Sequence, residues 1–210
     1  MTTLTESFNK ADGALGPDQA WTVDEGTVTV VSNKAARASA AGDSTSRINT
    51  LADTVNHYVE VTVASDNADA GSPAAMCRKA ASATLTHYFS ALDYSTSPNA
   101  DEVTLFRRVG GAYTSLATGS SLGDIAAVTE HVIKLEVNGS SLSTFYDGVA
   151  KHTNVTDTTI DGTSVGGKAI GICGGEAGNI TWDGLTAADI PSPPGPITAP
   201  SLNCWMGGWW

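Results

Sequence analysis

Residues 131–152, HVIKLEVNGSSLSTFYDGVAKH, constrain the fold more than any other stretch of the chain. They contain two dipeptides whose residue types tolerate the positive φ angles of tight hairpin turns, Asn138-Gly139 and Asp147-Gly148. Before the first dipeptide, Ile, Leu and Val alternate with Lys and Glu, which is the period-two pattern of a strand with one buried face. We therefore predict a three-stranded antiparallel meander, and a second sheet must cover its apolar face.

The composition suits a β protein with one core. The chain has 210 residues, of which 41% are hydrophobic and only 16% are charged. Abundant Ser, Thr, Gly and Ala suit a sheet surface better than they suit helices. A chain of this length can bury a substantial core, and a single all-β domain can use nearly all of it. The prediction is an all-β fold, a two-layer antiparallel β-sandwich with an extended C-terminal tail.

Several further runs have the alternation of strands, and they lie at 58–63, 85–90 and 103–108. The run at 85–90 carries large side chains at almost every position, so we expect it to bury both of its faces. Turn-rich stretches are expected to separate the strands, and they lie at 65–73, 95–101 and 119–124. Many short strands with frequent turns indicate a two-layer sandwich.

The charge and the termini exclude several classes of partner. A net charge of -11 would repel the phosphates of nucleic acids, so we expect no nucleic-acid partner. The first ten residues lack a basic stretch followed by an apolar run, so no signal peptide is expected. No apolar run approaches the roughly 18 residues that span a bilayer. We expect a chain that is made and kept in the cytoplasm of the cell that produces it.

The three cysteines do not form a recognisable framework. Cys77, Cys173 and Cys204 are an odd number at wide spacings, without a CxxC pair or a neighbouring histidine. They are predicted to be reduced, space-filling thiols rather than disulfide or zinc ligands.

Motifs near both ends of the first 190 residues resemble a known family. The opening stretch contains Phe8, Asp12-Gly13, Gly16 and Trp21 before a Val-rich strand, and later stretches contain Tyr146-Asp147-Gly148, a Gly-rich strand and Trp182-Asp183-Gly184-Leu185. In this order they resemble concanavalin A-like (laminin-G-like) jelly-roll domains, which recur in phage virion proteins and in carbohydrate-binding modules. The resemblance covers residues 5 to 190 and implies a jelly roll whose closing strand returns to pair near the first. It implies the fold rather than an activity.

Catalytic motifs are missing from the sequence. The resemblance extends to glycosidases whose Glu-x-Asp-x-x-Glu strand places three carboxylates on one face, and that motif is absent. Glu60, Glu130 and Glu136 are too far apart in sequence to replace it. Nucleophile-elbow, zinc-protease and phosphate-loop motifs are absent as well. We expect a protein that is not an enzyme.

One loop offers hard oxygen ligands. Asp66, Asn67 and Asp69 are followed by Gly71, and calcium prefers such oxygens in loops. The spacing is not that of an EF-hand. A calcium site and a solvated acidic turn are the two interpretations, and no other cofactor is expected.

The composition changes after residue 190. Residues 191–200 contain five prolines and are predicted to form an extended linker between the jelly roll at 1–190 and a Trp-rich tail at 201–210. Exposed aromatic surface commonly marks a contact site, so the tail is predicted to anchor the protein to an assembly. The anchoring side chains would be Leu202, Trp205, Met206, Trp209 and Trp210. The alternatives are a tail that folds back on its own domain and, less favoured, a tail that inserts at a membrane surface.

Two functions follow from the fold and the tail. The first is a structural virion protein of a bacteriophage, a capsid decoration, fibre or tail component located in the virion and bound to capsid or tail subunits, which we expect to be a homo-oligomer. The second is a carbohydrate-binding or receptor-binding adhesion module that binds host-surface glycans. Its sugar contacts would be exposed aromatic residues, chosen from Tyr88, Tyr94, Tyr113 and Tyr146, although tyrosines on strands also serve as core residues.

Deletion of residues 191–210 tests the predicted anchor. We expect the truncated chain to remain a soluble, cooperatively folding domain that no longer joins its assembly, because the anchoring side chains are gone. Incorporation of the truncated chain at the normal level would contradict the prediction.

Overall fold

The computed structural model describes residues 3–16, 18–37, 42–50, 52–68, 70–80, 85–95, 101–160, 167–175 and 178–191. These residues contain fifteen strands and no helix, so the all-β prediction is confirmed. Within this part of the chain, nothing helical is long and apolar enough to cross a membrane. The predicted anchoring tail at 201–210 and nearly all of the predicted linker lie outside the described residues.

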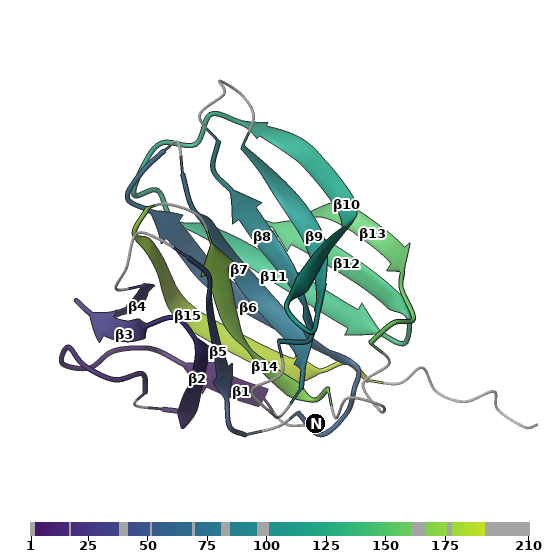
Figure 1. The fold of residues 1–210 in the computed structure, drawn as a ribbon, viewed down its shortest axis with the longest axis horizontal. Coiled ribbons are helices and arrows are strands. Elements are labelled where there is room, and N and C mark those ends of the chain that lie inside the picture. Colours follow the sequence, from purple (N-terminus) through teal and green to yellow (C-terminus); the bar gives the residue numbers. More distant parts are fainter. Residues whose placement is uncertain are drawn as a thin grey trace, which may run out of the picture.

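The strands form two antiparallel sheets that face each other, as Figure 1 shows. The eight-stranded sheet has the order β13-β12-β11-β6-β15-β4-β3, and β1 pairs with β15 beside this path. Its strands are β1 (Thr3–Glu6), β3 (Val28–Val31), β4 (Lys34–Arg37), β6 (His57–Ser65), β11 (His131–Asn138), β12 (Ser141–Tyr146), β13 (Val149–Thr156) and β15 (Ile180–Asp189).

The seven-stranded sheet has the order β10-β9-β8-β7-β14-β5-β2. Its strands are β2 (Trp21–Glu25), β5 (Ser44–Ile48), β7 (Ser72–Lys79), β8 (His87–Asp93), β9 (Asp101–Val109), β10 (Ala112–Gly123) and β14 (Ala169–Gly175). Some neighbours are consecutive strands, such as β7 to β10 and β11 to β13, whereas others, such as β6 with β15 and β14 with β5, come from distant parts of the sequence because the chain crosses between the layers. The predicted two-layer sandwich with jelly-roll connections is confirmed.

The predicted meander is strands β11, β12 and β13. The first turn pairs Asn138 with Ser141 across Gly139, whose φ is +60°, so the turn lies one residue later than the Asn-Gly dipeptide suggested. The second turn has positive φ at both Asp147 and Gly148, as a type I′ hairpin requires. The meander packs its apolar face on the other sheet, which is the arrangement that the alternation predicted.

The two family motifs at the ends of the domain meet in space. Strand β15 pairs antiparallel with β1, with Thr3 opposite Ala188 and Glu6 opposite Leu185, so the predicted return of the closing strand to the first is confirmed. The carboxylate of buried Glu6 accepts hydrogen bonds from the Phe8 amide at 3.0 Å and from the Trp21 indole at 2.9 Å. The aromatic residues of the opening motif therefore share one buried acceptor.

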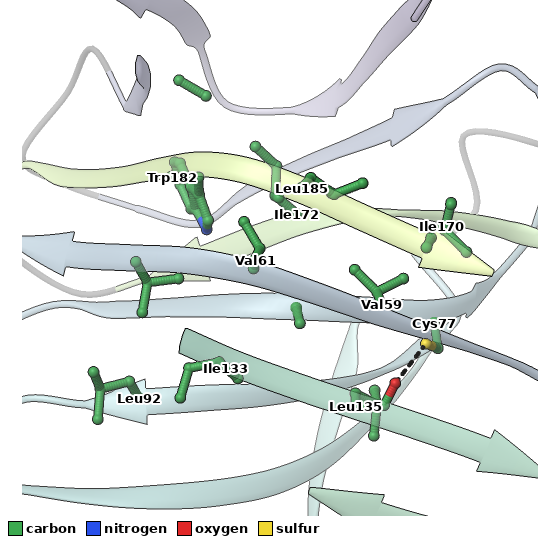
Figure 2. Close-up of a cluster of buried hydrophobic side chains, with 14 of the residues drawn as sticks. Val59, Val61, Cys77, Leu92, Ile133, Leu135, Ile170, Ile172, Trp182 and Leu185 are labelled. Carbon is green, nitrogen blue, oxygen red and sulfur yellow. Dashed lines mark hydrogen bonds between the residues drawn. The ribbon is translucent and has the colours of Figure 1, made fainter. Parts of the chain in front are cut away.

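The core lies between the sheets and consists of inward side chains at alternating positions. Figure 2 shows the side chains that each sheet contributes. Those from the eight-stranded sheet include Val59, Val61, Ile133, Leu135, Trp182 and Leu185; those from the seven-stranded sheet include Cys77, Leu92, Ile170 and Ile172. Complete burial of one such side chain contributes roughly 2 kcal/mol, so this layer dominates the stability of the fold.

The predicted turn at 119–124 is wrong. Strand β10 continues to Gly123, and three shifts of register between β10 and β9 absorb the irregular residues. A side chain at Gly119 would collide with that of Glu102, so this glycine permits a close approach to β9 rather than a turn.

The described cysteines agree with the prediction of unpaired, space-filling thiols. Cys77 and Cys173 are free and buried, and burial raises the pKa of both thiols. The Cys77 Sγ contacts the Leu135 carbonyl oxygen at 3.5 Å across the core, as Figure 2 shows. Cys204 lies outside the described residues.

Buried His57 connects the sheets at one end of the core. Its Nδ1 lies 3.1 Å from the Thr54 carbonyl oxygen, and its Nε2 accepts the Arg78 backbone amide at 3.2 Å. Because a carbonyl oxygen can only accept, Nδ1 carries the proton and the ring is neutral. Burial lowers the pKa of His57 to about 4.

Acid should therefore destabilise the protein through His57. The ring has an ordinary pKa of 6.5 in the unfolded chain, so between pH 6.5 and about 4 the unfolded state binds a proton that the folded state does not. The free energy of unfolding is expected to fall as the pH falls through this range, by about 3 kcal/mol in total from this residue. Denaturant unfolding at several pH values measures the change.

The variant His57→Gln should show a shallower decline of stability than the wild type over the same range, and His152→Gln, on the mostly exposed strand β13, is the matched control for the loss of a histidine. An identical pH dependence in all three proteins would contradict the assignment.

Candidate functional site

The outward face of the seven-stranded sheet carries a cleft. The alternation along β8 sends Tyr88 and Leu92 into the core, and His87, Phe89 and Ala91 to the opposite face. These outward side chains are buried too, so the prediction that residues 85–90 bury both faces is confirmed. A sheet whose second face is also apolar needs a cover or a ligand there.

Aromatic side chains form the floor of the cleft. The rings of Phe89 on β8 and Phe106 on β9 stack with centroids 5.0 Å apart and planes 16° apart. Tyr113 on β10 meets Phe89 edge-on at 5.9 Å, and His87 lies 5.6 Å from Phe89. Three neighbouring strands thus present a continuous apolar surface with one exposed phenol, because 48% of Tyr113 is exposed.

The rest of the lining, which we call the polar wall, consists mostly of polar residues and glycines. The cleft has a volume of about 220 Å³, and beyond the aromatic floor it is lined by Asp43, Ser44, Thr45, Ser72, Asp93, Cys173, Gly174 and Gly175. The wall thus supplies carboxylates, hydroxyls and backbone groups close to the rings.

Four side chains reach across the face from its two ends, and we call them the clasp: Glu25, Asp43, Arg108 and Tyr113. The Arg108 guanidinium donates to both Glu25 oxygens, at 2.5 and 3.0 Å, and to Asp43 Oδ2 at 3.3 Å. The Tyr113 hydroxyl donates to the same Asp43 oxygen at 2.5 Å, and its ring lies 4.5 Å below the guanidinium carbon.

The clasp joins strands that are far apart in the sheet. Arg108 and Tyr113 belong to β9 and β10 at one end of the strand order, whereas Glu25 ends β2 at the other end and Asp43 directly precedes β5. The neighbouring Asp24 carboxylate also reaches back, to Lys79 on β7 at 3.3 Å. These contacts require a curled sheet, so the outward face is concave.

Gly175 makes room for the clasp. A Cβ atom at this position would lie 2.9 Å from Asp43 Oδ1, closer than non-bonded atoms tolerate. The glycine of β14 therefore lets the carboxylate lie directly against the strand.

Burial sets the protonation states of the groups on the floor. It lowers the pKa of His87 to about 3, with Arg108 and Lys79 adding to the effect, so the ring is neutral at physiological pH. The His87 Nδ1 is buried and has no hydrogen-bond partner among the described residues. Burial also raises the pKa of the Tyr113 phenol, as does its hydrogen bond to Asp43, so the hydroxyl stays protonated and donates.

The structure places the tyrosines of the adhesion hypothesis in three environments. Tyr113 lies in the cleft. Tyr88 and Tyr94 are buried, at 0% and 2% exposure, so they cannot stack on a sugar in this structure. Tyr146 is half-buried on the other sheet, where it stacks on His131 with centroids 4.8 Å apart.

The predicted calcium loop is used for internal contacts. Asp66 accepts the Asn179 backbone amide at 2.8 Å and its side-chain amide at 2.6 Å. Among the residues with described positions, no cluster of three His, Cys, Asp or Glu side chains could hold a metal ion. Asp69 lies outside the described residues, and calcium at this loop stays a prediction.

Most of the cleft was not predicted from the sequence. Phe89 and Phe106 were recognised as strand residues, and outward aromatic residues on neighbouring strands could have indicated a binding face. Asp43, Glu25 and Arg108 carry no such signal, because they meet only through the curl of the sheet.

Comparisons with known proteins support the fold. No family model and no curated protein matches the sequence. Among solved structures, the chain is similar to the carbohydrate binding module CBM66 from Bacillus subtilis, with a TM-score of 0.58 and 18% identity over 81% of this chain and 93% of that chain. It is similar to Bacillus licheniformis β-glucanase, with a TM-score of 0.60 and 12% identity over 90% of this chain and 98% of that chain.

A third similar structure is the GH43 protein BlXynB from Bacillus licheniformis, with a TM-score of 0.62 and 12% identity. The match covers 89% of this chain but only 39% of that chain. The three likenesses show that the chain has the concanavalin A-like jelly-roll fold that its motifs indicated. At these identities they do not by themselves assign a function.

A double-mutant cycle measures the strength of the clasp. The Glu25 and Arg108 side chains are 26% and 6% exposed and pair through two hydrogen bonds, so Glu25→Gln and Arg108→Gln should show a coupling free energy of about 2 kcal/mol. The control pair Lys34–Glu130 is 34% and 47% exposed and should couple by less than about 1 kcal/mol. Equal coupling in both cycles, measured by denaturant unfolding, would contradict the structural role of the clasp.

Proposed function

We propose that this protein binds carbohydrate in the cleft on the concave face of its seven-stranded sheet. The observation that carries the proposal is the aromatic floor of Phe89, Phe106 and Tyr113 beside the polar wall that includes Asp43. A sugar ring has an apolar C–H face and a rim of hydroxyl groups, so it needs both kinds of surface. Binding sites commonly combine an apolar lining with a few polar groups in this way.

The fold neighbours support this proposal over the virion hypothesis. Two of the structures named above are, by their own descriptions, a carbohydrate binding module and a β-glucanase. None of the three points to a virion protein. The role in a bacteriophage particle, the capsid partners, the homo-oligomer and the location in a virion stay predictions.

The proposal is binding rather than hydrolysis. Hydrolysis of a glycosidic bond uses two carboxyl groups, one of which must donate a proton to the leaving group. Asp43 and Asp93 both line the cleft, and Asp43 already accepts hydrogen bonds from Tyr113 and Arg108, so its oxygens are engaged within the clasp. The sequence also lacks the alternating carboxylates of the glycosidases that share the fold.

A glycan array probed with the 210-residue chain tests the proposal. We expect specific binding that Phe106→Ala weakens about tenfold, because the loss of one stacking ring removes roughly 1.4 kcal/mol. The matched control is Phe145→Ala, a half-buried phenylalanine on the eight-stranded sheet. No binding to any glycan, or equal weakening by both variants with their folds intact, would contradict the proposal.

A further inference from the structure

We infer that the cleft takes one neutral sugar unit at the end of a glycan chain, not a unit in the interior of a chain. This inference rests on the proposed function and specifies the ligand of the same site. It comes from the clasp, which closes the concave face into a ring.

The ring can be followed strand by strand. From β9 the floor runs through β8, β7, β14 and β5 to β2, and the Glu25–Arg108 pair returns from β2 to β9. Two ion pairs hold the edge strand β2 over the concave face: Asp24 contacts Lys79 on β7, and Glu25 contacts Arg108 on β9. A register shift between Val23 and Glu25 marks a bulge where β2 bends.

A ring of this kind obstructs a long chain. An open trough would let a polysaccharide cross all the strands and extend beyond both edges. Here a chain that crosses the strands meets the clasp, whose members approach one another to between 2.5 and 3.3 Å. A chain that lies across the strands therefore has to end at the clasp, and its remaining units extend away from it.

The size of the cleft agrees with one unit. Its volume of about 220 Å³ lies below the roughly 300–1,000 Å³ of pockets that hold drug-sized ligands.

The charges of the lining favour a neutral sugar. Asp43 and Asp93 line the cleft, and Arg108, the one Lys or Arg among the described lining residues, already pairs with Glu25 and Asp43. The carboxylate of an acidic sugar would meet these negative groups without a cation that is not already paired. Neutral sugars can instead donate their hydroxyl protons to the carboxylates.

Counting the binding sites on a polymer distinguishes binding to chain ends from binding to units in the interior of a chain. The probes are neutral glucan, xylan, mannan and fructan, each as the intact polymer and as fragments made by partial hydrolysis, with acidic polygalacturonate for comparison. We expect the amount of protein bound at saturation per milligram to increase in proportion to the number of chain ends, so halving the mean chain length doubles it. No binding to polygalacturonate is expected.

A variant that opens the ring provides the control. Glu25 belongs to the clasp but does not line the cleft, so Glu25→Ala should retain sugar contacts while the dependence on chain ends weakens. Thermal unfolding establishes that the variant is folded. A capacity that does not change with fragmentation would overturn the chain-end inference and leave carbohydrate binding intact, whereas no binding to any probe would overturn both.

Discussion

Strand β8 contributes side chains to both the core and the cleft, because its residues point alternately to the two faces of the sheet. Tyr88 and Leu92 face into the sandwich and Phe89 and Ala91 face the cleft, because successive residues of a strand point to opposite sides. A slip by one residue would exchange the two sets and place Phe89 among the core residues of the other sheet. Both faces therefore fix the register, and the packing that stabilises the fold also holds the cleft floor in position.

The clasp specifies the shape of the sheet more than it adds stability. Removing Arg108 and its carboxylates from water is costly, and the cost is recovered only when the geometry is good and every donor is used. Here the guanidinium pairs with both oxygens of Glu25, and its Nε donates to the Gly111 carbonyl at 3.2 Å. A flatter sheet would leave these charges half-buried and unpaired, so the curled form is favoured over it.

The fold was predictable from local patterns, and the site was not. The meander at 131–152 and the motifs around Phe8 and Trp182 depend on residues a few positions apart, so the sequence displays them directly. The cleft depends on Arg108 meeting Glu25, 83 residues away, across five intervening strand pairings. The curl that joins them arises from bulges and twist summed over the whole sheet, which no short stretch of sequence records.

A cleft for one sugar unit implies weak binding by a single copy, because a small ligand offers few contacts and association itself costs free energy. Weak sites become effective when several are displayed together, since the second contact is made at a high effective concentration. The attachment predicted for the segment at 201–210 would provide such a display if the chain binds to an assembly with repeated positions. A terminal sugar unit occurs once per glycan chain. An array of copies of this protein would therefore bind a surface that carries many chain ends better than it would bind one long polymer. The two hypotheses drawn from the sequence are thus compatible in physical terms, because the proposed cleft would select the ligand and the predicted anchor would set how many clefts act together.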